Sequence, residues 1–128
     1  MAARVTAAHA LHAGRRGMAR ILVVEESAVA REALRELLGG EGHAVQLAAT
    51  TAEAESMIAS QVPDLVLTEA HAPGIDGLGL ARRLRAQAPA PAVLIMSVFR
   101  PAEVPPEAFL EKPIDLERLA ALIGRALV

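Results

Sequence analysis

The 128-residue sequence contains no cysteine, tyrosine or tryptophan and only two phenylalanines, Phe99 and Phe109. Without cysteine the chain has no disulfide framework, no thiolate zinc site and no cysteine nucleophile. The absence of cysteine also fits a reducing, cytoplasmic location. Because aromatic side chains are so scarce, the hydrophobic core has to be built from leucine, valine, isoleucine and alanine.

The sequence also lacks a strong charge of either sign and a long apolar run. Its net charge is −2, with both signs mixed along the chain, which gives no signature of nucleic-acid or membrane-surface binding. No apolar stretch approaches the roughly 18 residues that a membrane span needs. We therefore expect one domain with one hydrophobic core, and neither nucleic acid nor membrane among its partners.

The N-terminus differs in composition from the rest of the chain. Residues 1–17 contain three arginines and two histidines, His9 and His12, but no acid. They have neither the long apolar centre of a secretory signal nor the serine content of a transit peptide. Met18 then opens a run that would make a natural start by itself. We predict a flexible extension over residues 1–18, with a docked functional arm as the alternative, and a domain over residues 19–128.

Within the domain, strand and helix patterns alternate. Ser27, Thr50 and Asp115 can each cap a helix, and Glu53 adds capping-box spacing after Thr50. The predicted strands are residues 20–24, 43–48, 64–68, 92–97 and 108–111, and the predicted helices are residues 28–38, 51–60, 78–88 and 116–127. The apolar faces of the first and last helices are predicted at Ala30, Leu34, Leu37 and Leu38, and at Leu116, Leu119, Ala120, Ile123 and Leu127.

Repeated strand and helix units with wholly apolar strands predict an α/β fold, with a parallel sheet covered by helices on both faces. In such a sheet the site lies beyond the carboxyl ends of the strands. Alone, any polar residue there would be an ordinary solvated loop residue, but here three acids, a hydroxyl and an ammonium come together from four strands. These strand-end residues are Glu25, Glu26, Glu69, Ser97 and Lys112.

In this order and at these spacings, the sequence resembles a response-regulator receiver domain of two-component signalling. The matching pieces are ILVVEES, PDLVLTEAHAPGIDG, VLIMS and FLEKPID, and the resemblance covers everything except the N-terminal extension. It implies a flavodoxin-like, doubly wound sheet of five parallel strands in the order 2-1-3-4-5. It also implies a pocket in which Mg²⁺ binds and an aspartyl phosphate forms.

The resemblance assigns a role to each strand-end acid. Glu25 and Glu26 hold the places of the metal-site acids, and Glu69 holds the place of the phospho-acceptor. Glu69 would also belong to the metal site, together with the backbone carbonyl of His71, whose imidazole is expected to be no ligand. Ser97 holds the place of the switch hydroxyl.

The resemblance assigns further roles near the last strand. Phe109 holds the place of the switch aromatic, and Lys112 holds the place of the lysine that pairs with the phosphate. The bond between Lys112 and Pro113 is expected to be cis, which would turn the lysine into the pocket.

Two of the acids depart from the receiver pattern, because Glu69 and Glu26 stand where the family has aspartate. Each adds one methylene group in a pocket where a misplacement of about 1 Å can lower a rate by about 100-fold. Mg²⁺ also requires a near-ideal octahedron at about 2.1 Å. We therefore expect Mg²⁺ binding to be weak or absent. Glu69 should instead be a fixed anion paired with Lys112, imitating part of a phosphorylated state.

A second departure lies between Ser97 and Lys112, which are only 15 positions apart with three prolines between them. A helix of roughly 11 residues with its loops and a strand would need at least about 20 positions. The fourth helix of a receiver is therefore predicted to be missing or reduced to a turn. We expect residues 98–106 to form a mobile loop and Phe109 to prefer burial.

The sequence favours a stand-alone, pseudo-receiver signalling module that acts through protein-protein interaction without phosphorylation. A working phospho-acceptor in a phosphorelay is the alternative, and a Mg²⁺-dependent phosphatase or phosphotransferase is a minor one. Since no second nucleophile or substrate-binding insertion is found, we expect no enzyme. We expect no output domain after the last helix, so the expected partner is a signalling kinase, a downstream effector or a second copy of the chain.

Overall fold

The computed structural model describes residues 19–128, and the predicted extension over residues 1–18 lies outside them. The described chain alternates strands and helices much as expected. Its elements are β1 (Arg20–Val24), α2 (Ala28–Gly40), β2 (Ala44–Ala48), α3 (Thr51–Ser60), β3 (Leu65–Glu69), β4 (His71–Ala72), β5 (Ile75–Asp76), α4 (Gly77–Arg85), β6 (Ala92–Ser97), the 3₁₀ turn η1 (Pro106–Ala108), β7 (Phe109–Glu111) and α5 (Leu116–Ala126).

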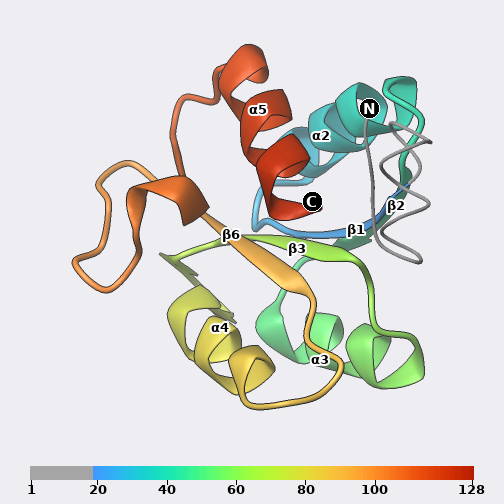
Figure 1. The fold of residues 1–128 in the computed structure, drawn as a ribbon, viewed down its shortest axis with the longest axis vertical. Helices are drawn as coiled ribbons and strands as arrows, with labels where there is room; N and C mark the ends of the chain where they lie inside the picture. The colour runs from blue at the N-terminus through green and yellow to red at the C-terminus, as the bar shows by residue number, and fades with distance from the viewer. Residues whose placement is uncertain (1–18) are drawn as a thin grey trace.

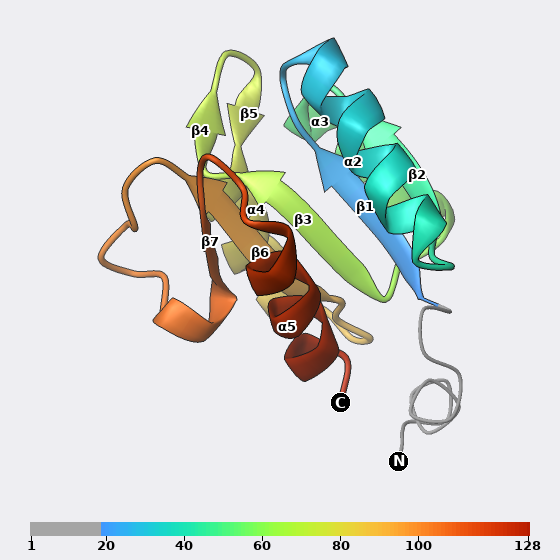
Figure 2. The ribbon, with the colours of Figure 1, turned by 90° about the horizontal axis from the view of Figure 1, so that it is seen from above.

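Five of the strands form one parallel sheet in the order β2-β1-β3-β6-β7. Counted along the chain these are strands 2-1-3-4-5, so the predicted flavodoxin-like fold is confirmed. Figure 1 shows the sheet between two helix layers, with α2 and α5 on one face and α3 and α4 on the other. Because the strands run in one direction, their carboxyl ends meet at one edge of the sheet, as Figure 2 makes visible.

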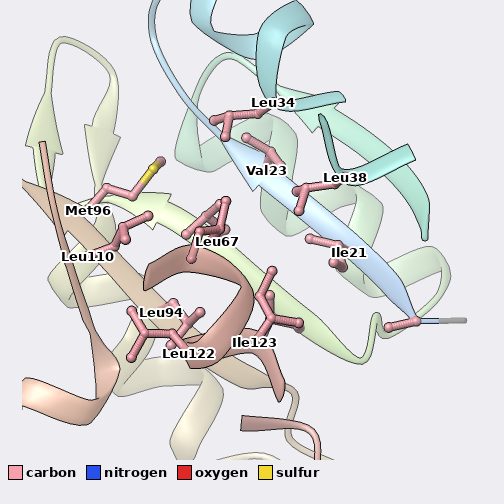
Figure 3. Close-up of a cluster of buried hydrophobic side chains, with 13 residues drawn as sticks. Ile21, Val23, Leu34, Leu38, Leu67, Leu94, Met96, Leu110, Leu122 and Ile123 are labelled. Carbon is pink, nitrogen blue, oxygen red and sulfur yellow. The ribbon is translucent and has the colours of Figure 1, made fainter. Parts of the chain in front are cut away.

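Two apolar clusters hold the layers together. The larger one packs α2 and α5 onto the sheet and is shown in Figure 3; it includes Ile21, Val23, Leu34, Leu38, Leu67, Leu94, Met96, Leu110, Leu122 and Ile123. The second one packs α3 and α4 onto the opposite face through Leu22, Val24, Val66, Ala54, Ile58, Leu80 and Leu84. Side chains alternate between the two faces along each strand, so β1 supplies both clusters.

The predicted apolar face of the first and last helices is wrong at three positions. Leu37 is 39% exposed, Leu116 is 51% exposed and Ala120 is exposed, whereas Leu122 is completely buried. Both helices carry more apolar residues than one face can hold. The sheet covers only the face turned toward it, and the sequence pattern did not show which one that is.

The helix caps follow the expected chemistry with one difference. Ser27, Thr50 and Asp115 each accept a backbone N–H from the first turn of the helix that follows. The carboxylate of Glu53, however, accepts the N–H of Ala49 at 2.6 Å, one residue before the position that a capping box would use.

A short antiparallel hairpin, β4 and β5, follows Glu69 and was not predicted as a pair of strands. Figure 2 shows it projecting beyond the sheet next to the end of β3. Its turn uses Gly74 at a φ of 79°, which favours glycine. The carbonyl of Gly74 accepts the N–H of Thr51, and the Thr51 hydroxyl accepts the N–H of Asp76, both at 2.9 Å. The segment after Glu69 is thereby tied to the start of α3.

The predicted loss of the fourth helix is confirmed, because only η1 stands between β6 and β7. No helix within residues 19–128 is both long enough and apolar enough to cross a membrane.

Candidate functional site

The side chains of Glu25, Glu69 and Lys112 meet at the carboxyl edge of the sheet and are called the pocket triad below. Lys112 is the only lysine of the chain, and its bond to Pro113 is cis, as predicted. The Lys112 Nζ lies 2.6 Å from the Glu69 Oε2 and 2.8 Å from the Glu25 Oε1. The expected ion pair between Glu69 and Lys112 is therefore present, and Glu25 shares the same ammonium.

The second oxygen of each acid in the triad is also bonded. The Glu69 Oε1 accepts the backbone N–H of Glu26 at 2.9 Å, and the Glu25 Oε2 accepts that of Ser27 at 2.8 Å. The Glu25 side chain is only 2% exposed and that of Glu69 is 14% exposed. All four carboxylate oxygens thus accept hydrogen bonds from within the chain, as buried charges require.

The charges around Lys112 determine its protonation. Burial of the ammonium lowers the pKa of Lys112, but hydrogen bonds and charge from Glu25 and Glu69 outweigh that effect. The net result is a pKa raised above the ordinary value of 10.5. Lys112 therefore keeps its positive charge at neutral pH and can offset the repulsion between the two carboxylates.

Arg31 is a second cation near the triad that sequence reasoning missed. Its Nη1 donates to the carbonyl oxygen of Glu25 at 2.8 Å and to that of Glu26 at 2.9 Å. The guanidinium thereby fixes the turn that brings the Glu26 N–H to Glu69. The available signal was spacing, because Arg31 lies one helical turn after the cap Ser27 and so near the end of β1.

Ser97 lies on the other half of the same edge, whereas Phe109 begins β7 opposite Ile95. Ser97 ends β6 and is half-buried, and its carbonyl accepts the N–H of Lys112 at 2.9 Å. Phe109 is half-buried against a small cluster formed by Ala70, Ala81, Ile95 and Val104. The expected burial of Phe109 is therefore only partial.

Residues 21–124 match the family described as "Response regulator receiver domain". The chain belongs to this receiver family. It is 34% identical over 119 residues to "Transcriptional regulatory protein ZraR" of Salmonella typhimurium, a match that covers 88% of this chain and 27% of that protein. It is also 34% identical over 109 residues to "Response regulator MprA" of Mycobacterium avium, with 80% of this chain and 48% of that protein covered. The chain thus spans between 27% and 48% of the length of these relatives.

A solved receiver domain confirms the fold. The crystal structure of the receiver domain from the hybrid histidine kinase CckA superposes with a TM-score of 0.73 at 32% identity. The superposition covers 85% of this chain and 99% of that domain. Receiver domains occur in response regulators and, in this case, in a kinase, so the family assigns a signalling role without a particular partner.

Receiver domains generally bind Mg²⁺ at the phosphorylation site, but the residues present here do not fit it in this arrangement. The predicted crowding of three carboxylates is wrong, because Glu26 is exposed and takes part only through its backbone N–H and carbonyl. Glu25 and Glu26 both follow the last residue of β1, and only Glu25 is buried. His71 is likewise exposed on β4, and no group of three His, Asp or Glu suited to a metal occurs within residues 19–128. A metal ion would have to displace Lys112 or a backbone N–H.

The loop over residues 98–106 replaces the fourth receiver helix and is tied down by several contacts. Val104 is 4% exposed and packs beneath it, and the Arg100 Nη1 donates to the Val104 carbonyl at 2.6 Å. Arg82 of α4 pairs with Glu103 of the loop at 2.6 Å. Phe99 remains 83% exposed. These contacts argue against the predicted mobility of the loop, which stays a prediction.

Proposed function

We propose that this receiver domain is a phosphorylation-independent signalling module that works in the cytoplasm by binding a protein partner. The observation that carries the proposal is the pocket triad, in which one ammonium is bonded to both carboxylates. Because every carboxylate oxygen of the triad is already bonded, the pocket is held in one state without a phosphoryl group or a metal. The partner would be a signalling kinase or a downstream effector.

Glu69 supports this proposal by its length as well as its charge. A glutamate at the acceptor position extends one methylene group farther than aspartate, which places its carboxylate 2.6 Å from Lys112. A phosphoryl group brings nearly two negative charges where Glu69 brings one, so the glutamate imitates the phosphorylated state only in part. The result is a permanent anion at the position where the family forms a transient one.

A phospho-donor assay tests this proposal. The full chain is incubated with acetyl phosphate and Mg²⁺ and then examined by intact-mass spectrometry. We expect the wild-type chain to stay unmodified, because both Glu69 oxygens already accept hydrogen bonds, from Lys112 and from the Glu26 N–H. The variant Glu69→Asp is the sensitised comparison, since a shorter acid loosens the pair and restores the residue type of the family.

The alternative of a working phospho-acceptor draws on family membership and on the place of Glu69 at the end of β3. An acyl phosphate on Glu69 of the wild-type chain would establish that alternative and overturn the proposal. Phosphorylation of Glu69→Asp but not of the wild type would support the proposal directly, because it would show that the length of the side chain decides the outcome.

A further inference from the structure

The five-stranded sheet has two edge strands, β2 and β7, and they differ in how well they are protected. β7 has only three residues, one of which is Glu111, and Pro113 follows shortly after it. Short strands, charges and prolines are common means of protecting a sheet edge. β2 has five residues, Ala44–Ala48, and none of them is charged or proline. Figure 2 shows β2 on the outer side of β1. β2 is therefore the edge that is open to a further strand.

The backbone of β2 has hydrogen-bonding groups that no described residue uses. The carbonyl of Ala48 accepts the N–H of Glu25 at 3.1 Å, so the backbone groups of Ala48 face β1. Backbone groups of successive residues alternate between the two sides of a strand. The N–H and carbonyl groups of Val45 and Leu47 therefore point away from β1, and within residues 19–128 they have no hydrogen-bond partner. Unpaired backbone groups of this kind are a template for another strand.

The next outward-facing N–H groups on either side are already bonded within the chain. The N–H of His43 donates to a carbonyl of α2 at 3.2 Å, and that of Ala49 donates to the Glu53 carboxylate at 2.6 Å. A strand that pairs with β2 can therefore use four groups in full, which are the N–H and the carbonyl of Val45 and of Leu47. This limit restricts how an added strand can be aligned.

A second copy of β2 satisfies all four groups. When two copies run antiparallel with Gln46 opposite Gln46, Val45 of each copy lies opposite Leu47 of the other. Residues paired in this way exchange both of their backbone hydrogen bonds, so four bonds use every free group on both copies. Any other antiparallel alignment leaves at least one of these groups unpaired. The half-buried side chains of Val45 and Leu47 also meet across the strands, and apolar cross-strand pairs stabilise a sheet.

Gln46 supports the pairing of this strand with itself. Its side chain is exposed, and in this alignment it lies opposite its own copy, with the two Cβ atoms about 4.5–5.5 Å apart. A glutamine amide both donates and accepts hydrogen bonds, so two of them can bond to each other. A charged residue at this position would repel its copy.

We propose that β2 is a self-association edge, and that two copies of the chain pair there in antiparallel fashion, joining their two sheets into one. Such a contact uses the same edge on both copies, so it closes as a two-fold dimer and does not extend into a filament. One strand per copy gives an interface below the standard size, so the dimer is weak, with a dissociation constant on the order of 100 μM. The side chains of the pocket triad take no part in the contact, so this inference stands apart from the proposed function.

Analytical ultracentrifugation of the full chain, from about 10 μM to about 1 mM, tests the proposal around that expected affinity. The wild type should pass from a 13.4 kDa monomer toward a dimer and no further. Over the same range, amide hydrogen exchange at Val45 and Leu47 should slow about fourfold, as the monomer fraction falls. The Ala44 amide, which is bonded within the sheet, should be protected throughout. Protection of Val45 and Leu47 in the monomer would mean that another segment of the same chain covers the edge, and would overturn the proposal.

Charges placed at Gln46 test the alignment. Gln46→Lys and Gln46→Glu should each weaken dimerisation at least about tenfold, because like charges then face one another. An equal mixture of the two variants should recover it, because opposite charges then meet. The matched control is Gln61→Lys, which changes an exposed glutamine away from β2 and should leave dimerisation unchanged. Melting temperatures of the variants at low concentration show that each is folded.

Four results would overturn the proposal. The first is a wild type that stays monomeric at about 1 mM, about tenfold above the expected dissociation constant. The second is a Gln46→Lys variant that dimerises as well as the wild type. The third is a mixture of the two variants that fails to recover, and the fourth is growth beyond a dimer.

Discussion

The two halves of the carboxyl edge of the sheet are held in place by different kinds of interaction. At the ends of β1 and β3, the carboxylates of Glu25 and Glu69 accept hydrogen bonds from Lys112 and from backbone N–H groups. Beyond β6, the loop over residues 98–106 is fixed by the buried Val104 and by arginine contacts, and it leaves Phe99 exposed to solvent. The first half is held mainly by electrostatics and the second mainly by apolar packing at a single point. Their responses to mutation should therefore differ in size and in pH dependence.

The largest effect is expected at Lys112. The substitution Lys112→Met leaves the buried Glu25 and Glu69 without their cation, and breaking a buried pair in this way costs about 3–5 kcal/mol. Urea unfolding at neutral pH measures the loss. Arg35→Ala removes an exposed pair with Glu32 and is the control, with an expected loss below about 1 kcal/mol. Equal losses in the two variants would show that the triad does not hold the pocket.

The loop half should depend on Val104. Val104→Ala removes two methyl groups from a buried contact with Ala70, Ala81 and Ile95, and we expect a loss of about 1–2 kcal/mol. Hydrogen exchange should then rise through residues 98–106, while the amide of Glu26 stays protected. Val98→Ala, at a site that is 57% exposed, is the matched control and should change stability by less than about 0.5 kcal/mol. A loop that exchanges equally fast in the wild type would contradict the anchoring role of Val104 and support the mobility predicted from sequence.

A smaller effect is expected at Arg31. Arg31→Ala removes the donor shared by the carbonyls of Glu25 and Glu26, and we expect a loss of about 1–2 kcal/mol. The Glu26 amide proton, which is bonded to Glu69, should shift upfield and exchange faster in NMR spectra. Arg31→Lys should recover part of both changes, whereas Arg35→Ala on the same helix should produce neither. An unchanged Glu26 amide in Arg31→Ala would contradict the positioning role.

The smallest expected effect is a change in stability that appears only at alkaline pH. The folded pKa of Lys112 is raised above 10.5, so its contribution to the free energy of unfolding is fully present below that pH and is lost as pH rises through the folded value. The chain has no Cys or Tyr and no other Lys to titrate in this range. The difference in unfolding free energy between wild type and Lys112→Met should stay constant from neutral pH to about 10.5 and shrink above it. A difference that shrinks already near neutral pH would contradict the sign of the shift.

Much of the fold could be predicted because its signals are local. Apolar runs gave the five sheet strands, and capping residues such as Ser27 and Asp115 gave the helix starts. The hairpin of β4 and β5 was not predicted, because strands of two residues show no periodicity. Leu122 was missed, because an apolar-rich helix does not reveal from its sequence which side meets the sheet.

The candidate site was predictable to the extent that residues at strand ends converge in a parallel sheet. That rule brought together Glu25, Glu69 and Lys112. It did not give the exposure of Glu26, because that residue lies beyond the end of β1, where strand alternation no longer fixes the direction of a side chain. It did not give Arg31 either, because the reach of that side chain depends on where α2 lies over β1.

NMR titration of the single lysine is the most direct test of the central claim, which is that Lys112 is held as a cation between Glu25 and Glu69. The chemical shift of its Cε carbon, followed with pH in the folded chain, gives the pKa without assignment ambiguity, since no other lysine is present. We expect a value above 10.5 in the wild type and a lower one in Glu69→Gln, which keeps the side-chain shape but removes one charge. A pKa at or below 10.5, unchanged by Glu69→Gln, would contradict the account.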